Sequence, residues 1–220
     1  MTTAVAGRMA TNNAIITGQP ELDGNVSAMD ALDFAPGNCR GTYKLIGGRP
    51  SLDFINTVSW PGTERAHDWL DSVENLKQWL RAVGMPAARG SRVDLQVAVD
   101  VRAALAAVLR PLAHGEQPAP GAMRSLNEYI SGAGSTRVID PATLTWTWKT
   151  PEQPLDLFAP VILDAAELIA AGKLDRFRHC PSCDWLFEDQ TRNAGRRWCD
   201  MGDCGSRDKS RRYYRRTRQE

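Results

Sequence analysis

Two pairs of cysteines near the C-terminal end are the residues best suited to chemistry in this sequence. Two residues separate Cys180 from Cys183, four separate Cys199 from Cys204, and fifteen lie between the pairs. Each close pair can form a knuckle, and the segment between them lets both knuckles meet around one metal ion. Four thiolates leave no open coordination position, so the spacing predicts one structural Zn²⁺ bound by these four cysteines.

Other interpretations of the cysteine pairs remain. A Cys-x-x-Cys pair alone can be a thioredoxin-like redox motif, but such motifs follow a strand in a βαβ unit, and the sequence before Cys180 predicts none. An iron–sulfur cluster also needs cysteines, but this spacing matches no common ferredoxin run. His179 could replace a cysteine as a ligand, although a place at the surface or beside the ligands is the simpler interpretation.

A strongly basic segment follows the last cysteine. After Gly205 and Ser206 it contains no helix breaker, so we expect a helix whose Tyr213 and Tyr214 share a face that could pack on the knuckle. We expect its cations to contact nucleic-acid phosphates; the alternative is a solvated basic tail. The residues of this predicted surface are Arg207, Lys209, Arg211, Arg212, Arg215, Arg216 and Arg218, with Arg196 and Arg197 on the knuckle side.

Charge is divided unevenly along the chain. Residues 176–220 contain 12 Lys and Arg against 7 Asp and Glu, whereas residues 1–175 contain 15 against 19. The larger part is therefore a poor nucleic-acid surface, and the basic end is a good one. No run of 18 apolar residues indicates a membrane span, and residues 1–20 lack the apolar stretch of a signal peptide. We expect a cytoplasmic protein with no membrane partner.

The apolar pattern predicts a mainly α fold with a small β-hairpin. A helical N-terminal domain (43–175) would precede a small treble-like zinc-knuckle module (176–220) that ends in the basic helix. We expect residues 1–42 to be disordered, and Cys39 has no assigned role. The predicted elements are a short helix from Ser51, helices over 71–83, 91–109, 120–130 and 154–171, and a hairpin of 137–140 with 144–148. Pro111 lies just beyond the predicted end of the helix over 91–109.

The segment around the second cysteine pair resembles the CGNR zinc-finger family. From Arg196 to Lys209 it reads RRWCDMGDCGSRDK, and the family joins an Arg-Arg-Trp-Cys stretch to a Cys-Gly-Asn-Arg signature. Ser206 replaces the signature Asn. Serine keeps a hydroxyl for capping but loses the amide that a bidentate adenine contact needs.

The region over residues 43–175 resembles the ABATE domain that accompanies this finger. The resemblance rests on the stretch GGRPSLDFINTV from Gly47 to Val58 and on the later Leu76, Trp79 and Leu80. It implies a bacterial transcription regulator, stress-related in some members, whose upstream domain senses a ligand.

A polar cluster inside the first of these stretches has two interpretations. Asp53, Asn56 and Thr57 are spaced to share one helical face among apolar neighbours. They could line a ligand-binding pocket, as a sensor domain needs, or form an internal hydrogen-bonded network. Arg49 and His67 could join either arrangement.

These features together predict a DNA-binding transcription regulator, not an enzyme. Its partners would be double-stranded DNA and a small-molecule effector, and it could form a homodimer. The alternatives are a zinc-stabilised module that binds RNA or protein, and an enzyme targeted by a zinc finger. The sequence has no nucleophile elbow, phosphate loop or His-Glu metal motif, and His67, His114 and His179 are scattered. Loss of the metal is expected to unfold residues 176–220 and leave the larger domain folded.

Overall fold

The computed structural model of the 220-residue chain describes residues 31–32, 34, 43–85, 92–172 and 174–218. The segment predicted to be disordered lies mostly outside these residues, as does Cys39. Its described part pairs β1 (Ala31–Leu32) with β2 (Tyr43–Lys44) and buries Phe34 against Tyr43 and Trp69. Within the described ranges, no helix has the length and apolar character needed to cross a membrane.

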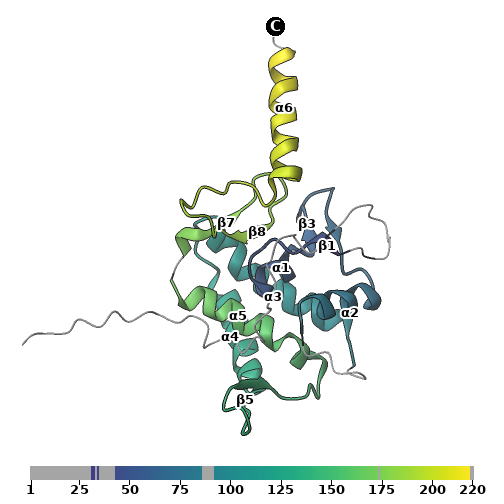
Figure 1. Cartoon of the computed structure of the whole chain (residues 1–220), viewed down its shortest axis with the longest axis vertical. Helices are drawn as coiled ribbons and strands as arrows, with labels where there is room; N and C mark the ends of the chain where they lie inside the picture. Colours follow the sequence, from purple (N-terminus) through teal and green to yellow (C-terminus); the bar gives the residue numbers. More distant parts are fainter. Residues whose placement is uncertain (1–30, 33, 35–42, 86–91, 173, 219–220) are drawn as a thin grey trace, which may run out of the picture.

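Helices make up most of the described chain and are joined by short two-stranded ladders (Figure 1), which confirms the predicted fold class. The α-helices are α1 (Pro50–Asn56), α2 (Val73–Ala82), α3 (Leu95–Ala113), α4 (Pro120–Gly134), α5 (Ala159–Ala170) and α6 (Ser206–Thr217). The shorter helical turns are η2 (Pro154–Phe158), η3 (Leu174–Arg176) and η4 (Met201–Gly205), the last a turn of π-helix.

Local capping chemistry explains where two of the helices begin. The Ser72 hydroxyl accepts from the Asn75 amide at the start of α2, and the Asp94 carboxylate accepts from the Gln96 amide at the start of α3. The prediction that α3 stops before Pro111 is wrong. Pro111 lies inside its last turn, where the missing N–H costs only one backbone bond, and α3 runs on to Ala113.

The four ladders are all antiparallel and very short. The predicted hairpin is confirmed as β5 (Arg137–Ile139) with β6 (Trp146–Trp148). The others are β1 (Ala31–Leu32) with β2 (Tyr43–Lys44), β3 (Val58–Ser59) with β4 (His67–Asp68), and β7 (Phe177–His179) with β8 (Leu186–Glu188). Strands of two or three residues have too few positions for a period-2 pattern, so sequence alone gave no sign of these three.

One hydrophobic cluster extends from the helices into the cysteine-rich segment. It joins residues such as Phe54 and Trp79 in the helical part to Leu186 and Phe187 on β8, all of them fully buried. The boundary between residues 175 and 176 stays a prediction, but packing is continuous across it. Burial of this shared surface stabilises both sides at once.

Asn56 connects the two sides through hydrogen bonds at the end of α1. Its side-chain amide donates to the Leu186 carbonyl at 2.8 Å and accepts from the Leu186 amide at 2.7 Å. Nearby, the Trp60 amide donates to the Cys183 carbonyl, and the Trp60 indole donates to the Ser182 carbonyl. These bonds attach the first cysteine knuckle to the helical part.

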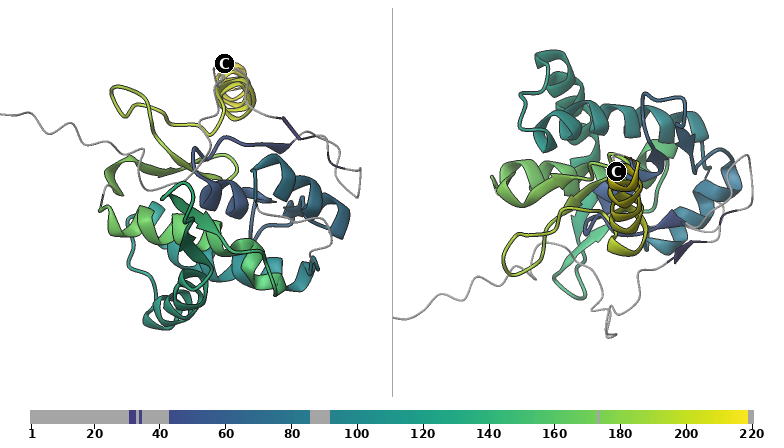
Figure 2. Two further views of the ribbon diagram at one scale, coloured as in Figure 1. Left: turned by 60° about the horizontal axis from the view of Figure 1, so that its bottom comes forward. Right: turned by 90° about the horizontal axis from the view of Figure 1, so that it is seen from above.

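α6 projects from the rest of the molecule (Figures 1 and 2). It continues directly from η4 and extends away from the helices, at the end of the molecule opposite β5. Twelve residues of helix reach about 18 Å. None of its residues is buried, so its direction depends on its attachment at the first turn.

We expect Asn56→Ala to lower the free energy of unfolding by about 1–3 kcal/mol, because it leaves both backbone groups of Leu186 without their partner in a buried place. Chemical denaturation measures the change. The matched control is Asn127→Ala on α4, where the side chain is exposed and the loss should be near zero. Equal effects of the two substitutions would contradict this role for Asn56.

Candidate metal centre and nucleic-acid surface

The four predicted cysteines lie together in a buried cluster. The Cys183 sulfur is 3.5 Å from that of Cys199 and 3.6 Å from that of Cys204, and the last two are 3.5 Å apart. All four Sγ atoms, including that of Cys180, lie within 4.8 Å of one another. A tetrahedral zinc with Zn–S bonds of about 2.3 Å sets its ligands about 3.8 Å apart. The cluster therefore fits a Cys₄ zinc site.

The backbone around each pair holds the thiols in place. In the first knuckle, the Cys180 amide donates to the Trp185 carbonyl and the Asp184 amide donates back to the Cys180 carbonyl, both at 2.8 Å. In the second, the Asp200 carboxylate accepts from the Asp203 amide at 3.1 Å. Lys44 on β2 donates to the side-chain carboxylates of Asp200 and Asp203, at 2.9 and 2.7 Å. These bonds tie the second knuckle to the helical part.

Hydrogen bonding within the cluster favours thiolate at Cys180. Hydrogen bonds from the other three thiols, that of Cys183 foremost, hold the pKa of Cys180 well below its ordinary value. The Arg207 guanidinium donates to the Cys204 sulfur at 3.4 Å and supplies positive charge beside the ligands. The four cysteine sulfurs therefore suit a cation that binds thiolates.

Two family models match this chain. A family described as "Putative stress-induced transcription regulator", ABATE, matches residues 48–172, and the CGNR zinc finger matches residues 176–217. This chain belongs to the ABATE family. It carries the CGNR finger after the ABATE region, in the order that the sequence indicated. No curated protein matches the chain.

The finger and the buried cysteine cluster together identify one structural zinc as the cofactor of this ABATE protein. Cys180, Cys183, Cys199 and Cys204 would hold it, with every coordination position taken by sulfur. His179 is next to Cys180 in the chain, and its Nδ1 lies 3.3 Å from the Asp184 carboxylate.

Two of the side chains predicted to contact nucleic acid make contacts within the protein. The Arg196 guanidinium donates to the Ile46 carbonyl at 3.0 Å and stacks on the Phe187 ring, 4.4 Å from its centroid. Arg207 lies over the Trp60 ring, 5.6 Å from its centroid, in addition to its bond to sulfur. Both side chains join the finger to the ABATE region. Their role in nucleic-acid binding stays a prediction.

The remaining basic residues of α6 are exposed. Arg211 reaches back to the Ser182 hydroxyl at 2.9 Å, and Arg212 pairs with Asp208 at 2.8 Å. Among the described residues, no ion pair engages the other three cations of α6, which are Lys209, Arg215 and Arg216, or Arg218 just after the helix. Arg197, outside the helix, lies over the Trp198 ring, 5.0 Å from its centroid.

The prediction that the tyrosine face of α6 packs on the knuckle is wrong. Tyr213 and Tyr214 are 64% and 65% exposed and contact each other edge-on, with ring centroids 5.9 Å apart. Because α6 extends away from the knuckle, no other described part of the chain covers its outer turns. The aromatic side chains therefore lie on the same open helix as the cations.

Two polar residues of the finger have local structural roles. Ser206, at the position of the signature Asn, donates to the Met201 carbonyl at 3.2 Å and so braces η4. The Asp189 carboxylate accepts from the amides of Thr191 and Arg196 at 2.9 and 2.8 Å and so caps this turn. Burial alone would raise the pKa of Asp189, but hydrogen bonds from the Thr191 hydroxyl and from these two amides lower it below its ordinary value.

The predicted ligand-binding residues of the ABATE region are buried and hydrogen-bonded within the protein. Asn56 pairs with Leu186, and the Thr57 hydroxyl accepts from Arg102 at 2.8 Å. The Asp53 carboxylate accepts from the Gly47 amide at 2.7 Å. These contacts favour the internal network over the pocket. Ligand binding by the three residues stays a prediction.

Arg49 and His67, the other candidates, lie apart from that network. Arg49 pairs with Asp164 at 2.8 Å and joins the start of α1 to α5. The His67 ring packs edge-on against Trp69, and burial lowers the pKa of His67.

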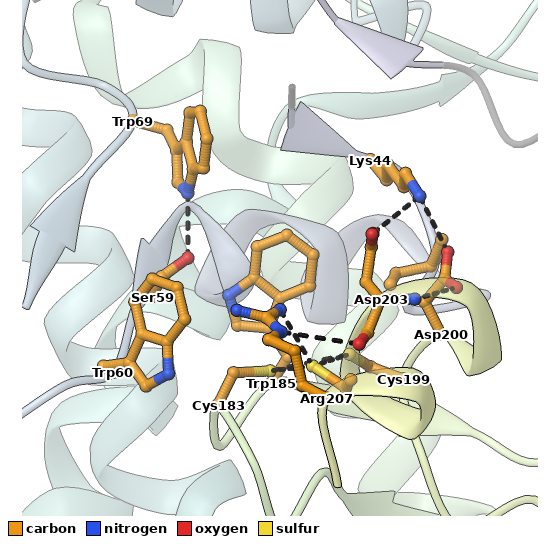
Figure 3. A pocket seen from close by; sticks show the side chains of 12 residues that line it. Lys44, Ser59, Trp60, Trp69, Cys183, Trp185, Cys199, Asp200, Asp203 and Arg207 are labelled. Atoms are coloured by element: carbon orange, nitrogen blue, oxygen red, sulfur yellow. Dashed lines mark hydrogen bonds and ion pairs between the residues drawn. The ribbon is translucent and has the colours of Figure 1, made fainter. Parts of the chain in front are cut away.

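A small pocket of about 90 Å³ opens where the ABATE region meets the zinc finger (Figure 3). Trp60, Trp69 and Trp185 form aromatic walls, and three of the zinc-ligating cysteines line another side. The Lys44 ammonium and its two carboxylate partners lie at the edge, with the guanidinium of Arg207 between them and Trp60. Sequence analysis missed this site because its charged pair, Lys44 and Asp200, is separated by 156 residues.

We expect zinc removal to destabilise the ABATE region as well as the finger. The shared core changes the sequence-based expectation of a separately folding knuckle, because Trp185 and Phe187 pack in the same cluster as α1 and α2. Structural zinc supplies on the order of 10–16 kcal/mol of apparent binding free energy in small fingers. Hydrogen exchange after chelation should show lost amide protection in α1. Unchanged protection there would restore the independent-module interpretation.

A second prediction concerns Asp53, whose pKa burial raises from an ordinary 3.8 to about 7. A raised folded-state pKa means that this group's stabilising contribution is complete below about pH 4 and is lost as the pH rises through 7. As the pH rises from 6 to 8, ionisation of Asp53 should lower the free energy of unfolding by roughly 1 kcal/mol. Denaturation of zinc-loaded protein should show that Asp53→Asn removes this slope and that Asp175→Asn, at an exposed carboxylate, retains it.

Proposed function

We propose that this ABATE protein is a cytoplasmic transcription regulator that binds double-stranded DNA through α6. The observation that carries the proposal is the open, basic helix whose first turn is attached to the zinc site. Its cations lie on a helix that nothing in the described chain covers, and the turn at its base is tied to the ABATE region by the ion pairs of Lys44 with Asp200 and Asp203. The matching families are of regulator and zinc-finger type, which supports a non-catalytic role.

The dimensions of α6 suit the major groove of DNA. An α-helix fits that groove, which is about 12 Å wide, and α6 extends about 18 Å beyond its anchor. Arginine and lysine on its exposed turns would contact phosphates on both sides. Arg207, at the start of the helix, is held by Trp60 and Cys204, so base readout would be limited and affinity would come mostly from phosphates.

The effector site in this proposal is the pocket between the ABATE region and the finger. A ligand of only a few heavy atoms would touch β2, β3 and η4 together, because Lys44, Ser59 and Asp203 all line it. η4 leads directly into α6, so occupancy would act on the base of the DNA-binding helix. Homodimerisation through the ABATE region is also part of the proposal. A module that binds RNA or protein through the same finger is the alternative.

We expect the affinity for duplex DNA to fall steeply with salt. If about four cations of α6 neutralise phosphates, log affinity against log salt should have a slope near −4, about −0.9 per contact. Arg215→Ala and Arg216→Ala should each weaken binding to all sequences alike and make the slope shallower by about one unit. Fluorescence anisotropy over a salt series measures both effects.

The matched control is Arg124→Ala, which removes an exposed cation from α4 and should change neither affinity nor slope. Structured RNA in the same assay separates the two nucleic-acid hypotheses. Duplex affinity that is insensitive to salt and to Arg215→Ala would refute α6 as the DNA-binding surface. Tighter binding of RNA than of duplex would favour the alternative.

A further inference from the structure

Three metal-ligating side chains meet on the surface beside the zinc knuckle, outside the cysteine cluster. His114 caps the C-terminal end of α3, His179 is the last residue of β7, and Asp184 lies in the turn that follows Cys183. The two histidines looked scattered in the sequence, yet their ring centroids lie 3.8 Å apart, with the ring planes tilted by 32° to each other. Each is about one-third exposed, so solvent reaches the group.

The ligand atoms are at coordination spacing. One Asp184 carboxylate oxygen, Oδ1, is 3.0 Å from His114 Nε2 and 3.3 Å from His179 Nδ1. A single atom from each of the three residues lies within 4.8 Å of the other two. Metal–ligand bonds of about 2.1 Å set neighbouring ligands roughly 3.0–3.4 Å apart in octahedral or tetrahedral geometry. An ion could sit between these atoms with little movement.

The other oxygen of the carboxylate is held by an arginine. Arg110 donates to Asp184 Oδ2 at 2.6 Å and to the Asp184 backbone carbonyl at 2.7 Å. A partner of this kind fixes the orientation of a ligating carboxylate and leaves Oδ1 directed at the two imidazoles. Its positive charge also opposes a nearby cation, which favours an exchangeable ion over a permanent one.

The backbone at Asp184 adopts a conformation that favours glycine. Its φ of 59° lies in the left-handed region, where glycine is the least strained residue. Aspartate tolerates that region better than most residues. The carboxylate at this place contacts Arg110, His114 and His179 together, which a glycine could not do.

We propose that His114, His179 and Asp184 form a second metal site, which binds an exchangeable Zn²⁺ or a similar imidazole-preferring divalent ion. Three protein ligands leave at least one position for water, unlike the closed Cys₄ centre. The site joins α3 of the ABATE region to the turn beside Cys183, so a bound ion would tighten the junction on which α6 depends. Its ligands are partly exposed, so the ion would exchange while the buried structural zinc stays in place.

The test measures metal stoichiometry in the full-length protein. Protein loaded with one zinc is dialysed against about 100 μM free Zn²⁺ and analysed for bound metal. We expect close to two zinc ions per chain for wild type and for the matched control His67→Ala, whose ring packs on Trp69 away from the site. His114→Ala should bind one, with second-site affinity reduced at least about tenfold. Asp184→Asn, which keeps the shape of the side chain, should behave like His114→Ala.

Cobalt distinguishes the new site from replacement at the cysteines. Co²⁺ added to the one-zinc protein should produce weak visible bands without the intense near-ultraviolet absorption of thiolate-to-metal charge transfer. Wild type that stays at one metal ion would overturn the proposal. So would a second ion that persists in His114→Ala, or cobalt bound with thiolate absorption.

Discussion

The direction of the basic helix depends on the tetrahedral arrangement of the four cysteines. Cys204 lies in η4, the turn that becomes α6, and the metal joins it to the first knuckle. That knuckle is in turn bonded to the ABATE region through Trp60, and β8 behind it through Asn56. The core, the first knuckle and the metal therefore fix the direction of α6 together. We expect the loss of any one of them to free the helix from that direction.

The outer turns of α6 carry like charges at a spacing that destabilises a helix. Arg211 and Arg212 are each followed four residues later by another arginine, and like charges at this spacing repel along a helix. Within the described part of the chain, only the first turns have compensation, from the Asp208–Arg212 pair and from the bond of Arg211 to Ser182. A polyanion would relieve the repulsion that remains, so phosphate binding and helix stability should reinforce each other.

Features encoded by local spacing could be predicted from the sequence, whereas contacts between distant segments could not. The zinc ligands follow from short intervals between cysteines, and capping residues such as Ser72 act on neighbours a few positions away. By contrast, Asn56 and Leu186 are 130 residues apart. The burial of Asn56 depends on how the whole chain packs. For the same reason, the helical spacing of Tyr213 and Tyr214 indicated a shared face but not what covers it.

The junction between the ABATE region and the finger also limits how any effector can act. The pocket is lined by Trp60 and Trp69 from one side and by zinc ligands from the other, so a ligand there contacts both. A ligand that binds more tightly when the finger is formed must, by thermodynamic linkage, raise the apparent affinity of the finger for zinc by the same factor. Sensing and metal retention would then be linked equilibria, because Trp185 of the zinc-held knuckle forms one wall of the pocket and Trp69, bonded to Ser59 within the ABATE region, forms another.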